Sequence, residues 1–262
     1  FTKNSNYKIG ETFIQSDLAN TLKRISYYGV KEFYEGETSK NIIKCMKRTG
    51  GIITADDLKN YKAIERKPIV FDYKGYKVYT MPPPSSGGVA LAGILNQLEN
   101  IDLSSIPYHS SDYIHYIVEA EKRVYSDRAF FLGDSDFNEI PIEILISDNY
   151  SKIRWSTVDS SIATPSSDIT YGNLDSYYNE SEETTHYSVV DKWGNAVSVT
   201  TTINGWFGNG IVVDNSGFLL NNEMDDFSSK PGHPNKYGLI GNKANAIEPN
   251  KRMLSSMTPT IV

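Results

Sequence analysis

The chain has 262 residues, which is enough to bury a sizeable core in one large domain or two small ones. Its formal net charge is −6 and no basic cluster offsets this balance, so a nucleic-acid-binding surface is not expected. No apolar run approaches the ~18–20 residues that a membrane-spanning helix needs, which argues against a transmembrane segment.

Cysteine and histidine usage argues against disulfide or metal chemistry. Cys45 is the only cysteine of the sequence, so an intrachain disulfide and a cysteine-based metal site are excluded, and a buried core thiol is expected. The four histidines show no ligand spacing such as HExxH. We therefore expect neither a metal nor a cofactor.

The first 65 residues read as helices separated by glycines. Apolar spacing after Ser16-Asp17 predicts a helix with these residues as its N-cap, and Gly29 should end it. A second helix should end at Gly50-Gly51, where left-handed backbone costs little. Thr54 is placed to cap a third helix whose first turn carries carboxylates.

Two short strands at 68–73 and 76–79 should follow, joined as a hairpin through Lys74-Gly75. The three prolines at 82–84 hold the chain extended, and the residues at 85–88 can cap or cradle the start of a helix at 89–98. That run lacks the lysine and the spacing of a phosphate-binding loop, so phosphate binding is rejected.

The longest helical pattern covers 110–132, and the mixed charges near its end should be solvated or form structural ion pairs. Residues 149–183 are polar with few aliphatic side chains, which predicts a loop or tail. From residue 184 the pattern is β, with segments 186–191 and 196–202 alternating around a turn at 192–195. This order of elements favours layers of helix against antiparallel sheet.

Thr184 opens this β region and is a candidate nucleophile. A threonine hydroxyl reacts poorly without a base, but an N-terminal threonine carries its own base, the α-amine, whose pKa lies near ~8. Thr184 is internal, so this chemistry requires cleavage of the Glu183–Thr184 bond. Alone, the Thr184-Thr185 pair is better explained as two β-branched residues that favour a strand.

A dense series of motifs follows Thr184, and together they resemble the γ-glutamyltransferase (γ-glutamyl transpeptidase) family. The matching segments are 184–191, 194–198, 200–204, 207–208, 220–227, 249–252 and 254–260, with 50–54, 57–58 and 82–88 in the first half. The resemblance covers nearly the whole chain.

The resemblance implies an N-terminal-nucleophile hydrolase of the α+β class, a four-layer αββα sandwich with antiparallel sheets between helical layers. It implies one domain over residues 1–262, made by a precursor that cleaves itself. Residues 1–183 would be the C-terminal part of the large subunit and 184–262 the N-terminal part of the small subunit, the two remaining paired. The family usually works in the periplasm, secreted or at the cell surface.

The implied reaction is attack by Thr184 on a γ-glutamyl amide such as glutathione, followed by transfer of the γ-glutamyl ester to water or to an amino acid or peptide. Thr202 matches the threonine that hydrogen-bonds near the nucleophile, although a solvent-facing strand threonine is the other interpretation. The residues that match the binders of the substrate α-ammonium are Asn204, Glu223 and Asp226.

Ser255 and Ser256 match the serines that bind the α-carboxylate, and Tyr237 matches a tyrosine on a lid loop over the site. The glycine pair of the family's oxyanion hole would lie beyond Val262, and the arginine that clamps the carboxylate would lie before Phe1. We therefore expect a core fragment whose own activity is uncertain.

Two alternatives stay open at the level of sequence. One is an acylase or a poly-γ-glutamate depolymerase of the same superfamily. The other is an unprocessed homologue that only binds, in which Thr184 is never released. The joint presence of the nucleophile and the other matched residues argues against the second, because a binding protein has no need of a nucleophile.

Overall fold

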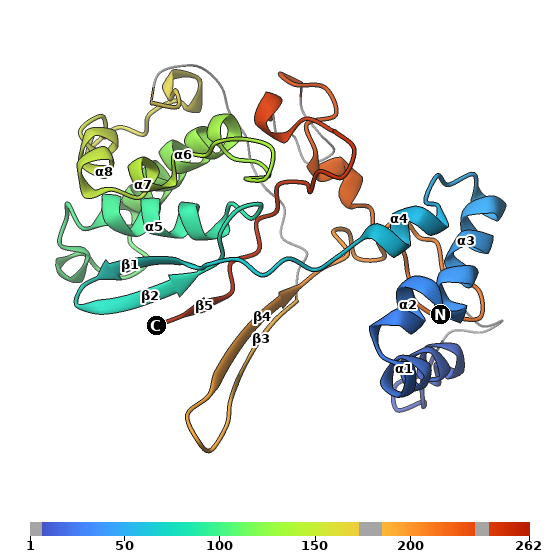
Figure 1. Cartoon of the computed structure of the whole chain (residues 1–262). Helices are drawn as coiled ribbons and strands as arrows, with labels where there is room; N and C mark the ends of the chain where they lie inside the picture. Colours follow the sequence, from blue (N-terminus) through green and yellow to red (C-terminus); the bar gives the residue numbers. More distant parts are fainter. Residues whose placement is uncertain (1–6, 173–184, 234–240) are drawn as a thin grey trace. The chain divides into compact units, whose positions relative to one another are not determined.

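The computed structural model describes residues 7–172, 185–233 and 241–262 (Figure 1). They fall into two compact units. The first unit comprises residues up to 65 and 205–222, and the second comprises 66–204 and 223–262. Helices and antiparallel sheets occur together, which confirms the α+β class. The division into large and small subunits at residue 184 stays a prediction.

Four helices build the first unit: α1 (Ser16–Tyr28), α2 (Val30–Glu35), α3 (Glu37–Thr49) and α4 (Ala55–Asn60). Gly29 ends α1 with a φ of 72°, as expected. The predicted N-cap of α1 was wrong by one residue. Gln15 is the last residue with non-helical dihedrals (φ −117°, ψ 71°), so the helix begins at Ser16 itself and no side chain caps it.

The remaining helix signals of this unit are confirmed. Gly50 caps α3 in the left-handed region (φ 74°, ψ 19°). The Thr54 hydroxyl accepts from the backbone N–H of Asp57, and the Asp57 carboxylate accepts from the backbone N–H of Thr54, which makes a capping box at α4.

A small apolar core holds α3 against the segment 205–222. Cys45 lies in it together with Ile42, Met46 and Val213, and all four are buried. The expectation of a buried core thiol is therefore confirmed. Thr21 adds a buried hydrogen bond of 3.0 Å to the carbonyl of Ser216 in the same segment.

The second unit contains a three-stranded antiparallel sheet of order β1-β2-β5, built from β1 (Ile69–Tyr73), β2 (Tyr76–Thr80) and β5 (Thr260–Ile261). The hairpin through Lys74-Gly75 is confirmed, with Ile69 opposite Thr80. Helices α5 (Gly87–Leu98), α6 (Ser111–Phe131), α7 (Ile142–Leu145) and α8 (Asp148–Trp155) lie on one side of β1 and β2 (Figure 1). Short 3₁₀ turns complete the unit: η1 (Leu103–Ser105), η2 (Ser166–Asp168), η3 (Glu223–Asp226) and η4 (Lys243–Asn245).

The core of this unit joins the sheet to α5. Its buried members include Phe71, Val78, Val89, Leu132 and Leu254. Each is an apolar side chain removed from water, which stabilises the fold by ~1.5–3 kcal/mol per large residue. The presence of Leu254 matters most for function, because it fixes the backbone immediately before Ser255.

Residues 149–183 were predicted to be a loop or tail, and the structure corrects this for the part it describes. Residues 148–155 form α8, and η2 follows. Ser147 caps α8 by accepting from the backbone N–H of Tyr150 over 3.2 Å. Arg154 is buried and donates to the carbonyl of Arg123 over 2.8 Å. Tertiary hydrogen bonds thus order a segment whose polar composition suggested none; residues 173–183 lie outside the described part.

The charged stretch of α6 contains the expected structural ion pairs. Arg123 donates to the carboxylate of Glu119 over 2.7 Å, and both side chains are about 1% exposed. Burial alone would raise the pKa of Glu119, but hydrogen bonds from Lys122, Thr164 and Arg123 outweigh it and lower that pKa to about 2.

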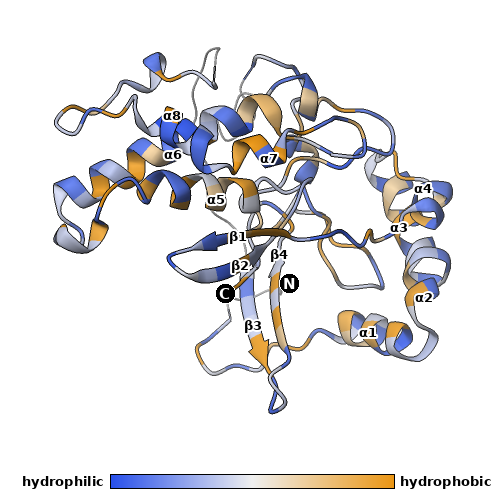
Figure 2. Cartoon of the chain, turned by 60° about the vertical axis from the view of Figure 1, so that its left-hand side comes forward, coloured by the Kyte–Doolittle hydropathy of each residue, from blue (hydrophilic) through white to orange (hydrophobic). Residues whose placement is uncertain are grey.

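Strands β3 (Thr185–Val190) and β4 (Ala196–Thr201) form a separate antiparallel hairpin, as predicted. The Asp191 carboxylate closes its turn by accepting from the backbone N–H groups of Trp193 and Asn195, both at 2.9 Å. The hairpin exposes apolar side chains such as Val189 and Val197, and the end of β3 is coloured as hydrophobic in Figure 2.

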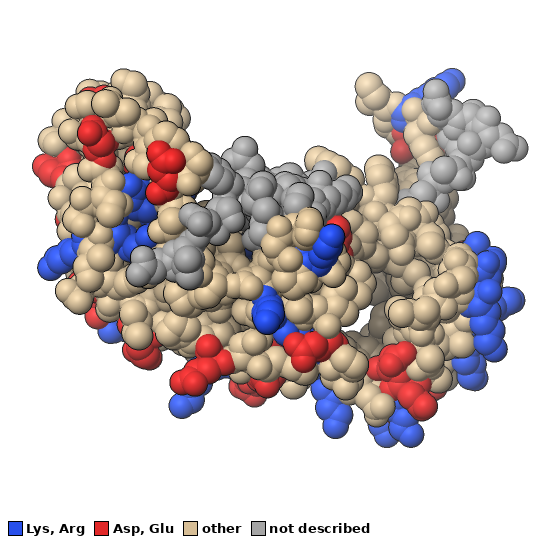
Figure 3. Space-filling view, turned by 90° about the horizontal axis from the view of Figure 1, so that it is seen from above, with Lys and Arg blue, Asp and Glu red and all other residues tan. Residues whose placement is uncertain are grey.

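Within residues 7–172, 185–233 and 241–262, no helix combines the length and apolarity needed to cross a bilayer. The same residues contain no group of three or more histidines, cysteines or carboxylates that could hold a metal. Acidic and basic side chains both appear on the face seen in Figure 3, where other residues make up most of the visible described surface.

Candidate active site

The chain leaves β4 through a sharp bend that carries two of the predicted site residues. Thr202 follows the last residue of β4, and its hydroxyl accepts from the backbone N–H of Asn204 over 2.9 Å. Asn204 has a φ of 67°, in the left-handed region that asparagine tolerates better than most residues. The bend therefore fixes the direction of the Asn204 side chain.

Asn204 contacts Asp226, a residue that the sequence associates with it only through the family resemblance. The Asn204 Nδ2 donates to Asp226 Oδ1 over 2.9 Å. Asp226 ends η3, and Phe227, the next residue, is buried and anchors the turn. An amide and a carboxylate held together are suitable partners for an ammonium group.

Glu223 starts the same 3₁₀ turn and is half-buried. Burial raises the pKa of its carboxyl above the ordinary value of 4.5, so it takes up a proton at a higher pH than a solvated glutamate does. Three predicted binders of the α-ammonium, Asn204, Glu223 and Asp226, are thus positioned by one bend and one turn of the second unit.

Ser255 and Ser256 follow the buried Leu254 and are held by the run at 82–88. Ser255 forms a parallel bridge with Ser85. The Ser255 N–H donates to the carbonyl of Pro84 over 3.0 Å, and the Ser86 N–H donates to the carbonyl of Ser255 over 2.7 Å. The Ser-Ser-Gly-Gly run therefore cradles another part of the chain, and Ser86, the N-cap residue of α5, makes no side-chain cap bond.

Glycine is required where this cradle is tightest. A Cβ on Gly87 would lie 2.1 Å from Thr258 Oγ1 and 2.6 Å from the carbonyl oxygen of Met257. Such distances are far inside van der Waals contact, so the serine segment approaches this closely only because residue 87 has no side chain.

Arg128 of α6 is a supporting residue that sequence reasoning missed. It is buried, yet its Nε donates to Ser86 Oγ over 2.8 Å and its Nη2 donates to Ser256 Oγ over 3.0 Å. Its partners are 42 and 128 residues away in sequence. No local pattern could have revealed it, because the buried residues of α6 include other charged side chains such as Glu119, Arg123 and Asp127.

Asn245 is a second such residue and joins the two halves of the site. Its Nδ2 donates to the carbonyl of Asp226 over 2.7 Å, and its Oδ1 accepts from the N–H of Leu254 over 2.9 Å. Asn245 is buried, at 5% exposure. The turn that carries Asp226 and the segment that carries Ser255 are therefore tied through one amide.

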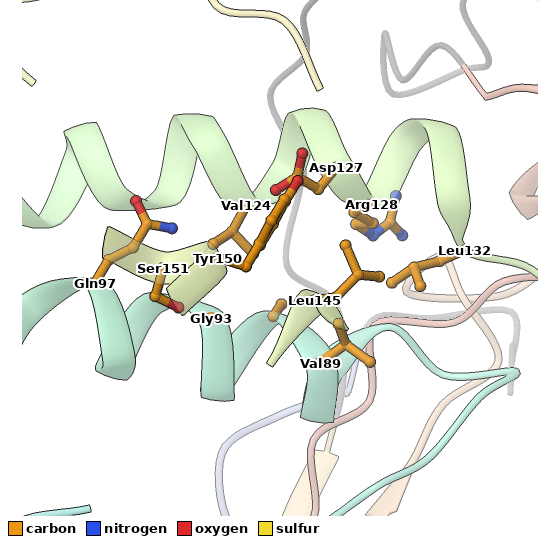
Figure 4. A pocket seen from close by; sticks show the side chains of 11 residues that line it. Val89, Gly93, Gln97, Val124, Asp127, Arg128, Leu132, Leu145, Tyr150 and Ser151 are labelled. Atoms are coloured by element: carbon orange, nitrogen blue, oxygen red, sulfur yellow. The ribbon is translucent and has the colours of Figure 1, made fainter. Parts of the chain in front are cut away.

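A small cavity lies between α5, α6 and α8, and Arg128 is one of the residues that line it (Figure 4). Its lining includes Gln97, Val124, Asp127 and Tyr150, and it has room for about one water molecule. Burial raises the pKa of Asp127 to about 6, despite the guanidinium of Arg154 at 3.2 Å, which favours the charged form. The cavity is too small for an amino-acid substrate and belongs to the packing beneath the site.

Thr184 and Tyr237 lie outside the described residues, so their predicted roles stay predictions. The residues next to position 184 are described. The antiparallel register places Thr185 opposite Thr201 and His186 opposite Thr200. His186 Nδ1 lies 2.8 Å from Thr200 Oγ1, so one face of the hairpin is polar near this end.

The α+β fold, together with its structural neighbours among gamma-glutamyltranspeptidases and cephalosporin acylases, defines the class of N-terminal-nucleophile hydrolases, the four-layer αββα sandwiches. The family model described as Gamma-glutamyltranspeptidase matches residues 1–262. The chain belongs to the gamma-glutamyltranspeptidase family.

Individual relatives agree with this assignment. The glutathione hydrolase proenzyme of Escherichia coli K12 is 53% identical over 97% of this chain and 44% of its own length. The gamma-glutamyltranspeptidase structure of Helicobacter pylori is 44% identical, with a TM-score of 0.63 over 68% of this chain and 52% of that one. Cephalosporin acylase from Bacillus halodurans is 25% identical, with a TM-score of 0.76 over 97% of this chain and 42% of that one. The chain thus spans about half the length of these relatives or less.

Proposed function

We propose that the full-length protein carrying this chain transfers or hydrolyses γ-glutamyl groups, with glutathione among its donors. The proposal rests on one observation: Asn245 links two sets of residues, one suited to an ammonium group and the other to a carboxylate. Asn204 and Asp226 suit the α-ammonium of a glutamyl group, while Ser255 and Ser256 suit its α-carboxylate. Together they would recognise the amino-acid end of a γ-glutamyl donor and leave its γ-carbonyl free for attack.

Thr184 would be the nucleophile. It directly precedes Thr185, the first residue of β3, which pairs with Thr201, and Thr201 directly precedes Thr202. After cleavage of the Glu183–Thr184 bond, the freed α-amine would take the hydroxyl proton as Oγ attacks the γ-carbonyl carbon. The proton would pass to the departing amine, leaving a γ-glutamyl ester on Thr184. Water or the amine of an acceptor amino acid or peptide would then resolve the ester.

The glutathione hydrolase proenzyme name of the Escherichia coli relative, at 53% identity, supports both the donor and the processing step. Cleavage would give two subunits that remain paired. By family resemblance the protein would work in the periplasm, secreted or at the cell surface; cell fractionation followed by immunodetection tests this.

The test uses the full-length protein and its Thr184→Ala variant. Intact mass and N-terminal sequencing should show a new N-terminus at Thr184 in the wild type and an uncut chain in the variant. The wild type should release the chromophore from a γ-glutamyl anilide, and the variant should be inactive. A wild-type protein that stays uncut and inert would overturn the proposal in favour of a binding protein.

A second candidate is an acylase or a depolymerase of poly-γ-glutamate, which the similarity to cephalosporin acylase favours over unrelated chemistries. It is separated by substrate. If the processed protein leaves γ-glutamyl anilides and glutathione intact but deacylates a cephalosporin or shortens poly-γ-glutamate, this candidate replaces the first.

A further inference from the structure

We propose that Arg128 is a positioning residue for the substrate carboxylate, acting through the hydroxyl of Ser256. This inference rests on the proposed function, since it assigns a task to a residue behind the same site. Its basis is the 3.0 Å contact from Arg128 Nη2 to Ser256 Oγ and the 2.8 Å contact from Arg128 Nε to Ser86 Oγ.

The argument begins with the chemistry of the contact. A guanidinium has five N–H donors and no acceptor, whereas a hydroxyl has one proton and two lone pairs. Ser256 Oγ must therefore be the acceptor in its contact with Arg128, and its proton is directed away from the guanidinium. Ser256 is exposed while Arg128 is buried at 8% exposure, so the guanidinium approaches this hydroxyl from the interior side.

A serine whose hydroxyl is held in this way is prepared to donate to an anion. Accepting a hydrogen bond from a cation also polarises the O–H bond and strengthens its donation. The guanidinium adds positive potential behind the serine without having to touch the substrate. The expected beneficiary is the α-carboxylate, the group that Ser256 is proposed to bind.

Arg128 is itself held in place, so it can hold Ser256. Its guanidinium carbon lies 5.8 Å from the centre of the Tyr125 ring, in the range of a cation–π contact. Its second serine partner, Ser86, donates its own hydroxyl proton to the carbonyl of Ser255 over 2.8 Å. One side chain thus supports both the hydroxyl of Ser256 and the backbone of Ser255.

Lysine cannot replace this arrangement. An ammonium is a point charge that lacks the planar fork needed to reach Ser86 and Ser256 at once. Arg128→Lys keeps the charge but loses one of the two bonds, and Arg128→Met loses both. Both variants leave Thr184 and the Asn204–Asp226 pair unaltered in sequence.

The test compares two competitive inhibitors of the full-length, processed protein acting on a γ-glutamyl anilide. Glutamate carries the α-carboxylate, and 4-aminobutanoate lacks it. In Arg128→Lys and Arg128→Met, the inhibition constant of glutamate and the KM of the anilide should rise about tenfold or more, while the inhibition constant of 4-aminobutanoate should change less than about twofold. The kcat should change less than the KM.

Two controls separate this role from a structural one. Arg123→Met removes another buried arginine of α6, one that bonds Glu119 and Thr157 and neither serine, so it should reduce stability without raising the KM selectively. In a Ser256→Ala background, replacing Arg128 should produce little further rise in KM, because the residue acts through Ser256. Arg128→Lys, the milder change, keeps the test open if Arg128→Met does not fold.

The outcomes are distinct. An Arg128→Lys protein that is folded and processed but binds glutamate as the wild type does would overturn the inference. So would equal losses for glutamate and 4-aminobutanoate, or full additivity with Ser256→Ala. A wild-type protein that is processed yet inert toward the anilide would instead overturn the proposed function. The role assigned to Arg128 in binding a γ-glutamyl donor would then fall with it.

Discussion

Asn204 and Asp226 are 22 residues apart in sequence and joined by a hydrogen bond of 2.9 Å from Nδ2 to Oδ1. The bond presets the carboxylate, so less side-chain entropy is lost when an ammonium binds. It also occupies one lone pair of Asp226 Oδ1.

Asp226→Asn should weaken recognition of the α-amine without unfolding the protein. The new amide keeps the shape and can still accept from Asn204, but it loses the charge. We expect the KM of a γ-glutamyl anilide to rise by ~10–100-fold, since a charge-assisted hydrogen bond contributes ~1.5–3 kcal/mol. Inhibition by glutarate, which lacks the α-amine, should be unaffected. Equal losses for glutamate and glutarate would contradict the assignment.

The raised pKa of Glu223 predicts that substrate binding depends on pH. Because burial raises its pKa above 4.5, the carboxyl becomes neutral as pH falls through that raised value, and attraction for the α-ammonium is lost there. The inhibition constant of glutamate should therefore rise on the acid side in the wild type. Glu223→Gln should flatten this rise, because an amide does not titrate. Asp225→Asn, on the same turn, is the matched control and should retain it.

Asn245→Ala should damage both stability and binding. It removes the hydrogen bonds to the carbonyl of Asp226 and from the buried N–H of Leu254, which costs ~2–4 kcal/mol in total. Asn245→Asp can still accept from Leu254 but cannot donate to Asp226. The amide of Leu254 should therefore lose less protection against hydrogen exchange in Asn245→Asp than in Asn245→Ala. Urea unfolding and amide hydrogen exchange at Leu254 measure these effects, and exchange that stays slow in Asn245→Ala would contradict the linkage.

Gly87→Ala should disrupt the cradle of Ser255. The added methyl would overlap Thr258 Oγ1 and the carbonyl of Met257, and the backbone on that side would have to move. We expect a loss of ~1–3 kcal/mol of stability and a strong loss of activity. Gly93→Ala on the same helix is the control. There the nearest atom is Val124 Cγ2 at 3.1 Å, which needs to shift only slightly, so the loss should be smaller.

Asp127 should make the stability of the second unit pH-dependent. Its pKa in the folded chain is about 6 against 3.8 for the free carboxyl, chiefly because of burial, so the native state binds the proton more tightly. This contribution is complete below about pH 3.8 and is lost as pH rises through about 6. Relative to Asp127→Asn, the wild type should therefore gain on the order of 1 kcal/mol in free energy of unfolding between pH 7 and pH 5, and its Tm should rise accordingly. Parallel melting curves that never diverge would contradict it.

The sequence predicted best where the structure is set by neighbours in the chain. The capping box of Thr54 and Asp57, the left-handed Gly50 and the Lys74-Gly75 turn each depend on residues within a few positions. Helix α8 was missed because Arg154 is buried by contacts with α6, and composition alone made the segment read as solvated.

The candidate site divides along the same line. Asn204, Asp226, Ser255 and Ser256 could be named from the motifs in which they stand. Arg128 and Asn245 could not, because each acts across the fold, and an arginine on α6 or an asparagine at the end of η4 carries no local signature. The prediction for the 82–88 run was correct in part. The run does cradle another group, but the group that it holds is the Ser255 segment.

The parallel bridge between Ser85 and Ser255 joins one residue that precedes the proposed cleavage position in sequence to one that follows it. Once the 183–184 bond is broken, the bonds from Pro84 and Ser86 to Ser255 become contacts between two polypeptides. Dissociation then competes with unfolding, so the Tm of the mature protein should increase with its concentration, whereas that of an uncut Thr184→Ala precursor should not. Neither product alone would hold a finished carboxylate subsite. The mature enzyme would behave as a complementation pair, in which activity reports reassembly of the two pieces.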